Sequence, residues 1–299
     1  MRGTPQVDLA LPVGRPYARI VVADRLYVAS RIVDVGGIRT HYLDAGDGPP
    51  LVLLHSGEFG ASAALCWERQ IPALAPHFRI IAPDWLGFGG TDKLRDFVSG
   101  SDRMIRHLAA FLEVLAIDHA DFVGCSMGGT MLLREVSSGR GRLPVDRMVL
   151  ISAGGFVPDN EHRRALLEYD GTTDGMRRIV AATFADPAFV QDEAYLERRV
   201  QASLAPGAWE AIAATRLKAP NIPPRSDFGH ADTTPYEHIT IPTLAIAGSA
   251  DKLREPNYHA AFHRVPRGEV VVLQGAGHLL NIERAEECNN AILKFLQRQ

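Results

Sequence analysis

Residues 121–130 read DFVGCSMGGT, in which an apolar run ends at a serine and a helix-like run begins directly after it. The five residues GCSMG fit the pattern G-x-S-x-G, which places a serine on a sharp strand-to-helix turn. Strand and helix pass so closely there that the residues two before and two after the serine must be small, and both are glycine. The turn would expose the hydroxyl of Ser126, whereas Cys125 is expected to face the packed interior.

Apolar runs on both sides of this turn predict strands that are buried on both faces of a sheet. Helical patterns separate these runs in strict alternation, which indicates a parallel sheet with helices on its faces. Ahead of them, two alternating stretches joined by Gly36 and Gly37 predict an antiparallel hairpin. The apolar runs are LVLLH (51–55), FRIIAPD (78–84), ADFVGCS (120–126), RMVLIS (147–152), PTLAIAG (242–248) and VVVLQGAGH (270–278).

The strand pattern stops between residues 156 and 238, where charged and helix-like segments take its place. Because the alternation of strands and helices resumes after residue 238, we interpret this stretch as a helical insertion into one α/β domain. The predicted organisation is therefore a core of residues 1–155 and 239–299 with a helical cap of residues 156–238.

Composition limits the partners of the chain. Its 299 residues are 46% hydrophobic, which is enough to bury the core of one large domain. The 32 basic and 35 acidic residues are mixed along the chain, so we expect neither nucleic acid nor a membrane as a partner. Three cysteines without a CxxC pair fit a reducing, cytoplasmic location. The N-terminal VDLALPVG is too short and interrupted for a signal peptide, and no run reaches the length of a membrane span.

A serine hydroxyl needs a base and an orienting carboxylate to act as a nucleophile, and both are expected later in the chain. His278 follows the last predicted strand in GAGH, and Asp251 follows the preceding strand in AGSADKL. All three residues lie in loops at the carboxyl ends of strands, where sheets of this class bind ligands. Ser126, Asp251 and His278 are therefore predicted to form a catalytic triad. Metal-ligand spacing and a phosphate loop are absent from the sequence, so we expect no metal and no cofactor.

These motifs together resemble those of the α/β-hydrolase superfamily, and the match runs from about residue 33 to residue 296. It rests on HSGEFG (55–60), DWLGFGGTD (84–92), GCSMG (124–128), GSAD (248–251) and GAGH (275–278). The resemblance implies an α/β-hydrolase fold, with a mostly parallel central sheet, helices on both faces and an inserted helical cap over the site.

The loop HSGEFG is expected to carry part of an oxyanion hole. The backbone NH of Met127 is one predicted donor, and by the resemblance the backbone NH of Gly57 is the second. Ser56 stands where the family usually has glycine, and we take it as a substrate-binding candidate. A carboxylate pointing inward would oppose the developing negative charge, so Glu58 is expected to turn toward solvent or the cap.

The segment of residues 186–220 resembles the caps of hydrolases that split meta-cleavage products of aromatic rings. In those caps an arginine in a comparable Y-x-x-R setting binds the carboxylate of the substrate. The corresponding pattern here is YLER, which makes Arg198 a substrate-binding candidate. The alternative is that Arg198 and Arg199 belong to a solvated helix face together with Glu193 and Glu197.

The sequence thus predicts a cofactor-free serine hydrolase that acts on a small, largely apolar carbonyl compound through an acyl-enzyme. The bond it cleaves is either a carboxylic ester or lactone bond, or a carbon–carbon bond as in a meta-cleavage product. Leu279 follows the histidine where the carbon–carbon hydrolases commonly carry tryptophan, so both options stay open. The alternative from another class is a ligand receptor with slow or no turnover. A homodimer is also left open.

Overall fold

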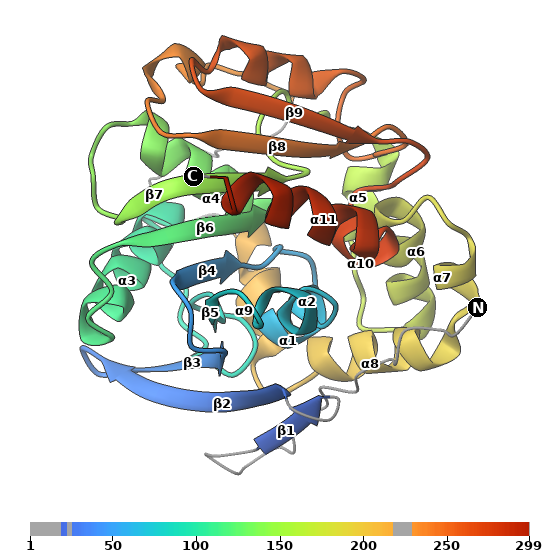
Figure 1. The fold of residues 1–299 in the computed structure, drawn as a ribbon. Helices are drawn as coiled ribbons and strands as arrows, with labels where there is room; N and C mark the ends of the chain where they lie inside the picture. Colours follow the sequence, from blue (N-terminus) through green and yellow to red (C-terminus); the bar gives the residue numbers. More distant parts are fainter. Residues whose placement is uncertain (1–18, 23–25, 218–228, 299) are drawn as a thin grey trace.

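The computed structural model of the chain describes residues 19–22, 26–217 and 229–298. Its central sheet has nine strands in the order β1-β2-β3-β5-β4-β6-β7-β8-β9 (Figure 1). The pairs from β5 through β4 to β9 are parallel, and the pairs that involve β1, β2 and β3 are antiparallel. The strands are β1 (Arg19–Val22), β2 (Leu26–Val35), β3 (Ile38–Ala45), β4 (Pro50–Leu54), β5 (Arg79–Pro83), β6 (Ala120–Cys125), β7 (Val145–Ile151), β8 (Thr243–Gly248) and β9 (Gly268–Leu273).

The hairpin of β2 and β3 forms where the sequence predicts it. Val35 pairs with Ile38, and the two residues between them, Gly36 and Gly37, have φ of 61° and 84°. Two consecutive residues with positive φ match the right-handed twist of the flanking strands, and glycine adopts this conformation without steric cost. The glycine pair therefore sets the register of the antiparallel edge.

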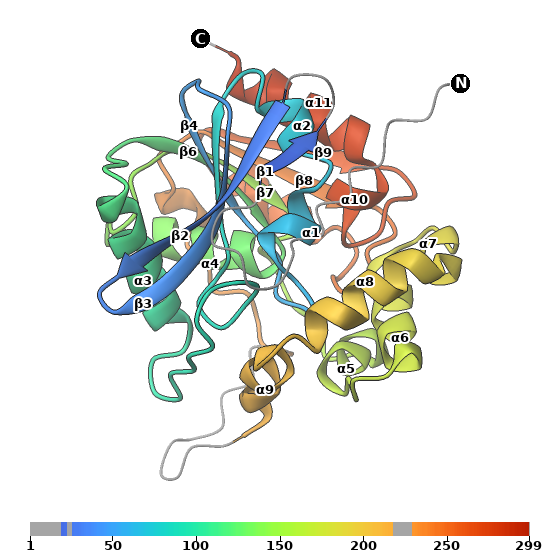
Figure 2. The same ribbon diagram turned by 90° about the horizontal axis from the view of Figure 1, so that it is seen from below.

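Helices cover both faces of the sheet (Figures 1 and 2). Alternate residues along each strand face opposite sides, so each strand contributes to two cores. Leu53, Val123 and Ile151 pack with α1, α2 and α11 on one side, and Leu54 and Phe122 pack with α3 and α4 on the other. The helices are α1 (Ala63–Trp67), α2 (Ile71–Leu74), α3 (Ser101–Val114), α4 (Met127–Ser137), α10 (Leu280–Glu283) and α11 (Ala285–Leu296), with a 3-10 helix η3 (Tyr258–Arg264).

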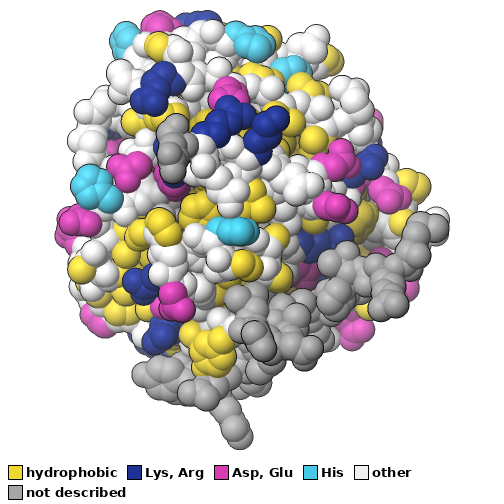
Figure 3. Space-filling model, in the orientation of Figure 1, with side chains coloured by type: hydrophobic (Ala, Val, Ile, Leu, Met, Phe, Trp, Pro, Cys, Tyr) yellow, Lys and Arg dark blue, Asp and Glu magenta, His cyan; other side chains and the backbone are white. Residues whose placement is uncertain are grey.

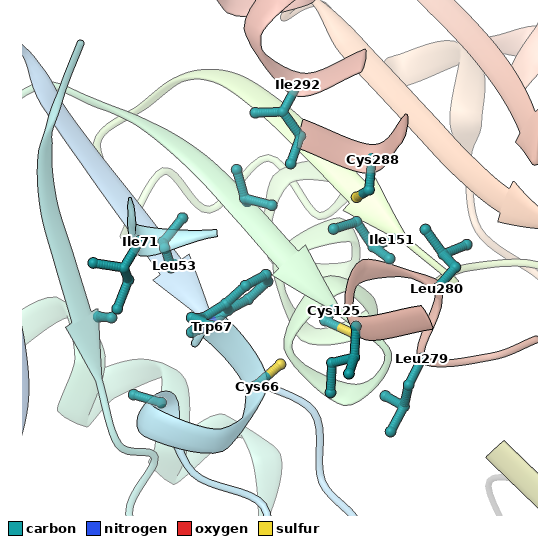
Figure 4. Close-up of a cluster of buried hydrophobic side chains, with 14 of the residues drawn as sticks. Leu53, Cys66, Trp67, Ile71, Cys125, Ile151, Leu279, Leu280, Cys288 and Ile292 are labelled. Atoms are coloured by element: carbon teal, nitrogen blue, oxygen red, sulfur yellow. The ribbon is translucent and has the colours of Figure 1, made fainter. Parts of the chain in front are cut away.

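The first of these cores holds Cys125, the residue before the predicted nucleophile. Cys125 is fully buried, as the sequence predicts, and Figure 4 shows it pointing into the same cluster as Cys66 and Trp67. The contact with Cys66 raises the pKa of the Cys125 thiol well above its ordinary value, and burial raises it further. Cys125 is therefore a packed, un-ionised side chain that anchors the end of β6.

A helical region lies between β7 and β8, where the sequence predicts a cap. Figures 1 and 2 both show its helices gathered on one side of the sheet, with α8 close to α1. The exact bounds of the predicted cap, 156–238, stay a prediction, and its residues 218–228 lie outside the described part. Its elements are α5 (Glu161–Leu167), α6 (Thr173–Thr183), α7 (Ala188–Gln191), α8 (Glu193–Ser203), α9 (Ala208–Ala213), η1 (Ala214–Arg216) and η2 (Tyr236–His238).

The surface agrees with the mixed charge of the sequence. On the face shown in Figure 3, basic and acidic side chains are interspersed rather than gathered by sign. Within the described residues, no helix is both long enough and apolar enough to cross a membrane.

Asp84, directly after β5, forms hydrogen bonds with three other segments of the chain. Its carboxylate accepts hydrogen bonds from the backbone NH of Ala63 and of Gly90, each at 2.7 Å, and from Nδ1 of His41 at 2.7 Å. A Cβ atom on Gly89 would lie 2.0 Å from the same carboxylate. The glycine is therefore required by the close approach of the loop, and Asp84 fixes the start of α1 behind the HSGEFG loop.

Asp84 is ionised although it is buried. Burial by itself opposes ionisation, but the contacts with His41 and the NH of Ala63 outweigh it and hold the pKa of Asp84 below its ordinary value. A carboxylate whose pKa is lower in the folded than in the unfolded state contributes stability above the unfolded pKa, and that stability is lost as the pH falls through the folded pKa.

Replacing Asp84 with Asn should lower the free energy of unfolding at pH 7 by about 1.5–3 kcal/mol, the range for hydrogen bonds to a charged group. The difference in the free energy of unfolding between wild type and variant should become smaller as the pH falls below about 4, which is near the pKa of an aspartate in the unfolded state. Denaturant unfolding at several pH values measures both effects. The exposed Asp118→Asn is the control and should shift stability by less than about 0.5 kcal/mol. A gap that does not change with pH would contradict the ionised state.

Candidate active site

Ser126 is the single residue between the end of β6 and the start of α4. Its backbone has φ 50° and ψ −110°, a strained conformation for a residue with a Cβ atom. Its NH donates to the carbonyl of Ile151 on the neighbouring strand at 2.8 Å, and its carbonyl accepts from the NH of Thr130 at 2.8 Å. These bonds hold the turn in place from both sides, and the side chain of Ser126 is left partly exposed.

The two flanking glycines are required by the packing of this turn. A Cβ atom on Gly124 would lie 2.5 Å from Cα of Gly129, and one on Gly128 would lie 2.3 Å from the carbonyl oxygen of Leu54. Both distances are far below van der Waals contact, and the obstacles are backbone atoms that cannot rotate away. The G-x-S-x-G pattern thus reflects the close passage of α4 across β6 and β4.

The three residues predicted as a triad lie in one hydrogen-bonded row. Oγ of Ser126 is 2.7 Å from Nε2 of His278, and Nδ1 of His278 is 2.8 Å from Oδ2 of Asp251. Because the carboxylate only accepts, Nδ1 carries the proton and Nε2 is free to accept from the serine hydroxyl. The side chains of His278 and Asp251 are each 2% exposed, so this row is shielded from water up to the serine.

Asp251 is held in its charged form. Its burial opposes ionisation, but His278, Arg254 and the backbone NH of Leu253 outweigh that effect and lower the pKa of Asp251. The NH of Leu253 donates to Oδ1 at 2.9 Å, which leaves Oδ2 for the histidine. The carboxylate is thus oriented before any substrate arrives.

Glu283 positions the loop that carries His278, and the sequence offered no signal for this role. Its carboxylate accepts from the backbone NH of Gly277 at 2.6 Å and from the NH of Ala185, at the end of α6, at 3.0 Å. One glutamate in α10 therefore joins the histidine loop to the helical region between β7 and β8.

The loop of residues 55–60 lies against the start of α4, as the oxyanion prediction requires. A Cβ atom on Gly57 would lie 2.5 Å from Sδ of Met127, so the two predicted donor residues adjoin. His55 anchors the loop: Nδ1 donates to the carbonyl of Ser56 at 2.6 Å, and Nε2 accepts from the NH of Trp85 at 3.0 Å. Complete burial lowers the pKa of His55, which keeps this imidazole neutral.

Ser56 is fully buried in this loop. Its hydroxyl is directed at Sγ of Cys66, 3.8 Å away, within the core on the α1 side of the sheet. The substrate-binding role of Ser56 stays a prediction.

Glu58 turns to the cap, which is one of the two orientations expected from the sequence. Its carboxylate forms an ion pair with Arg199 of α8, with Oε1 3.0 Å from Nη2. The same Nη2 donates to the carbonyl of Phe59 at 3.2 Å, and Nη1 donates to the hydroxyl of Tyr195 at 3.2 Å. Arg199 therefore connects the HSGEFG loop to α8 through an ion pair and a hydrogen bond.

The neighbouring Arg198 takes a different partner. Its Nη1 lies 2.8 Å from Oε2 of Glu68, a buried carboxylate next to α1. The predicted substrate-binding role of Arg198 stays a prediction, but the solvated-face alternative is wrong for Arg199, whose side chain is 1% exposed. The missed signal was the spacing of Tyr195, Arg199 and Ser203, which puts all three on one buried helix face.

Within the described residues, no group of three or more His, Cys, Asp or Glu side chains is arranged to hold a metal ion.

Comparison with known proteins places these features in a family. Residues 49–285 match the family model described as the alpha/beta hydrolase fold. A 2-hydroxy-6-oxo-6-(2'-aminophenyl)hexa-2,4-dienoic acid hydrolase of Metapseudomonas resinovorans is 34% identical over 90% of this chain and 91% of its own length. A 2-hydroxymuconate semialdehyde hydrolase of Pseudomonas sp. strain CF600 is 32% identical over 89% of this chain and 93% of its own.

Solved structures agree with these relatives. A meta-cleavage product hydrolase from Pseudomonas fluorescens superposes with a TM-score of 0.79 and 28% identity, over 89% of this chain and 97% of that one. The fold and the hydrogen-bonded row of Ser126, His278 and Asp251 are thus found in a chain whose relatives are hydrolases. The chain belongs to the α/β-hydrolase fold family and is similar, within it, to the meta-cleavage product hydrolases.

Proposed function

We propose that the chain is a cofactor-free serine hydrolase with Ser126 as nucleophile, His278 as general base and Asp251 as the residue that orients the imidazole. The observation that carries the proposal is the unbroken row of hydrogen bonds from Asp251 through His278 to Ser126 at the strained turn. A base within hydrogen-bond distance of the hydroxyl, itself oriented by a carboxylate, is the arrangement that activates serine.

The chemistry follows from this row. Nε2 of His278 accepts the hydroxyl proton while Oγ of Ser126 attacks a carbonyl carbon. The backbone NH groups of Gly57 and Met127 would stabilise the negative charge that develops on the carbonyl oxygen, and one such donor is typically worth about 10²- to 10³-fold in rate. His278 then gives the proton to the leaving group, and a water molecule that it deprotonates hydrolyses the acyl-enzyme.

For the substrate we propose a ring-opened product of aromatic cleavage, cut at a carbon–carbon bond beside a ketone. Two curated relatives that cover about nine-tenths of the chain are named as hydrolases of a 2-hydroxy-6-oxo-dienoic acid with an aminophenyl group and of 2-hydroxymuconate semialdehyde. Next to the loop, the ring of Phe59 packs against Tyr169 and Trp209 with centroids 4.9 and 6.5 Å apart, and this largely buried aromatic cluster joins the loop to the cap.

Carboxylic ester or lactone hydrolysis is the second candidate, because it needs only the triad and the oxyanion donors. One observation favours it: Arg198 and Arg199 of α8, the candidate partners for a substrate carboxylate, already form ion pairs with glutamates. A small-molecule substrate is common to both candidates. A cytoplasmic location and a homodimer stay predictions, and light scattering of the purified chain measures the second.

Ser126→Ala should lower kcat by about 10⁴-fold or more, on both a p-nitrophenyl ester and a 2-hydroxy-6-oxo-dienoate. The control is Cys125→Ala, which changes the neighbouring residue but leaves the hydroxyl and its base in place, and should keep most of the activity. Release of nitrophenolate and bleaching of the dienoate measure the two reactions. Near-normal turnover by Ser126→Ala would rule out the proposed nucleophile, and the ratio of the two wild-type rates decides between the candidates.

Asp251→Asn should lower kcat by about 10⁴-fold while the fold is retained, because the amide stabilises the wrong tautomer of the imidazole and cannot balance the imidazolium. Since the pKa of Asp251 lies below its ordinary value, the wild-type carboxylate is charged throughout the range from pH 5 to 8, about where such enzymes are assayed. The deficit should therefore persist across that range in a pH–rate profile. The exposed Asp118→Asn is the matched control, and a deficit that disappears at any pH in the range would contradict the assigned role.

A further inference from the structure

Two adjacent arginines of α8 each meet a glutamate from the core. Arg198 pairs with Glu68 at 2.8 Å, and Arg199 pairs with Glu58 at 3.0 Å. Both glutamates are buried, with 4% and 5% of their side chains exposed. Each of these two arginine charges of α8 is therefore balanced by one buried glutamate of the same chain.

The pair of Glu58 and Arg199 is the one next to the chemistry. Glu58 directly follows Gly57, a predicted oxyanion donor, and Arg199 also holds the carbonyl of Phe59 in the same loop. Burial opposes the charge of Arg199, but Tyr195 and Glu58 outweigh it and keep the pKa of Arg199 above its ordinary value. The guanidinium is thus charged and already engaged with an anion.

We infer that Glu58 determines substrate specificity: its carboxylate neutralises Arg199, so the site selects carbonyl substrates that are uncharged at the end facing α8. The inference rests on the proposed function and narrows its substrate class. Esters and lactones whose cap-facing group is an alkyl or aryl group meet this requirement, and a 2-hydroxy-6-oxo-dienoate meets it only with its carboxylate turned away from α8.

The physical reason is the local charge balance. A substrate carboxylate that reached Arg199 would either displace Glu58 or add a second negative charge beside it. Displacement would leave a buried carboxylate without its partner, which is strongly unfavourable. Addition would place a net negative charge next to Gly57, where the carbonyl oxygen itself becomes negative during attack. Both outcomes disfavour a charged group at this end of the substrate.

The test compares two esters of matched length, p-nitrophenyl pentanoate and mono-p-nitrophenyl glutarate, which differ by a terminal methyl or carboxylate group. Wild type should prefer the pentanoate in kcat/KM by about tenfold or more, or ~1.4 kcal/mol. Glu58→Gln, which leaves Arg199 charged, should reduce or invert that preference by a similar factor. The double variant Glu58→Gln with Arg199→Gln should restore the preference, because it removes the positive charge that Glu58→Gln leaves without its partner.

The matched control is Glu197→Gln, which removes a carboxylate from the exposed face of the same helix and should leave the preference unchanged. Circular dichroism confirms that each variant folds. The wild-type comparison requires no variant: if wild type cleaves the glutarate as well as the pentanoate, the inference is wrong. It is also wrong if Glu58→Gln and Glu197→Gln have the same preference between the two esters. It is likewise wrong if Arg198→Ala has a lower kcat/KM than wild type for the glutarate alone, because Arg198 would then bind the substrate carboxylate.

Binding separates this inference from the proposed function. Calorimetry with hexanamide and hexanoate, in wild type and in Glu58→Gln, needs no turnover. Wild type should bind the amide and exclude the carboxylate, and Glu58→Gln should gain affinity for hexanoate by about tenfold or more. A wild type that cleaves neither the esters nor a 2-hydroxy-6-oxo-dienoate but shows this binding pattern would overturn the proposed function and support the inference. Equal binding of both ligands by wild type would overturn the inference alone.

Discussion

The site depends on one steric constraint, the close passage of α4 across β6 and β4. Backbone atoms of Gly129 and of Leu54 occupy the space that a side chain at position 124 or 128 would need. The chain can turn from strand to helix in one residue only because these positions are glycine, and that residue, Ser126, is left with positive φ. The strain is tolerated because hydrogen bonds to β7 and within α4 hold the turn.

The parallel sheet supplies the other two members of the row. Asp251 and His278 follow β8 and β9, and the carboxyl ends of parallel strands meet at one edge of the sheet. Both side chains are buried, so the imidazole is positioned by the carboxylate and not by water. His278 and Ser126 thus lie on distant parts of the chain, and sheet pairing brings the imidazole and the hydroxyl into hydrogen-bond contact.

Charge is the second organising influence, because an unpaired charge cannot remain in the interior at low cost. Asp84 is engaged by His41 and by backbone NH groups, Asp251 by His278, and Glu58 by Arg199. Each of these pairs joins segments that are distant in sequence. The pair of Glu58 and Arg199 is the most consequential, since it connects the cap helix α8 to the loop that carries Gly57. The position of the cap and the electrostatics of the site are therefore coupled.

The sequence by itself determined the order of strands and helices along the chain, the glycine hairpin, the turn at Ser126 and the placing of Asp251 and His278 after neighbouring strands, because each depends on local spacing or on the direction of the chain. It missed β1, which pairs with β2 at the antiparallel edge of the sheet. Only the tertiary structure decided that Arg199 is buried and that Arg198 meets Glu68. Neighbouring arginines on a helix look alike in sequence, and their difference arises from partners about 130 to 140 residues away that only folding brings within hydrogen-bond distance.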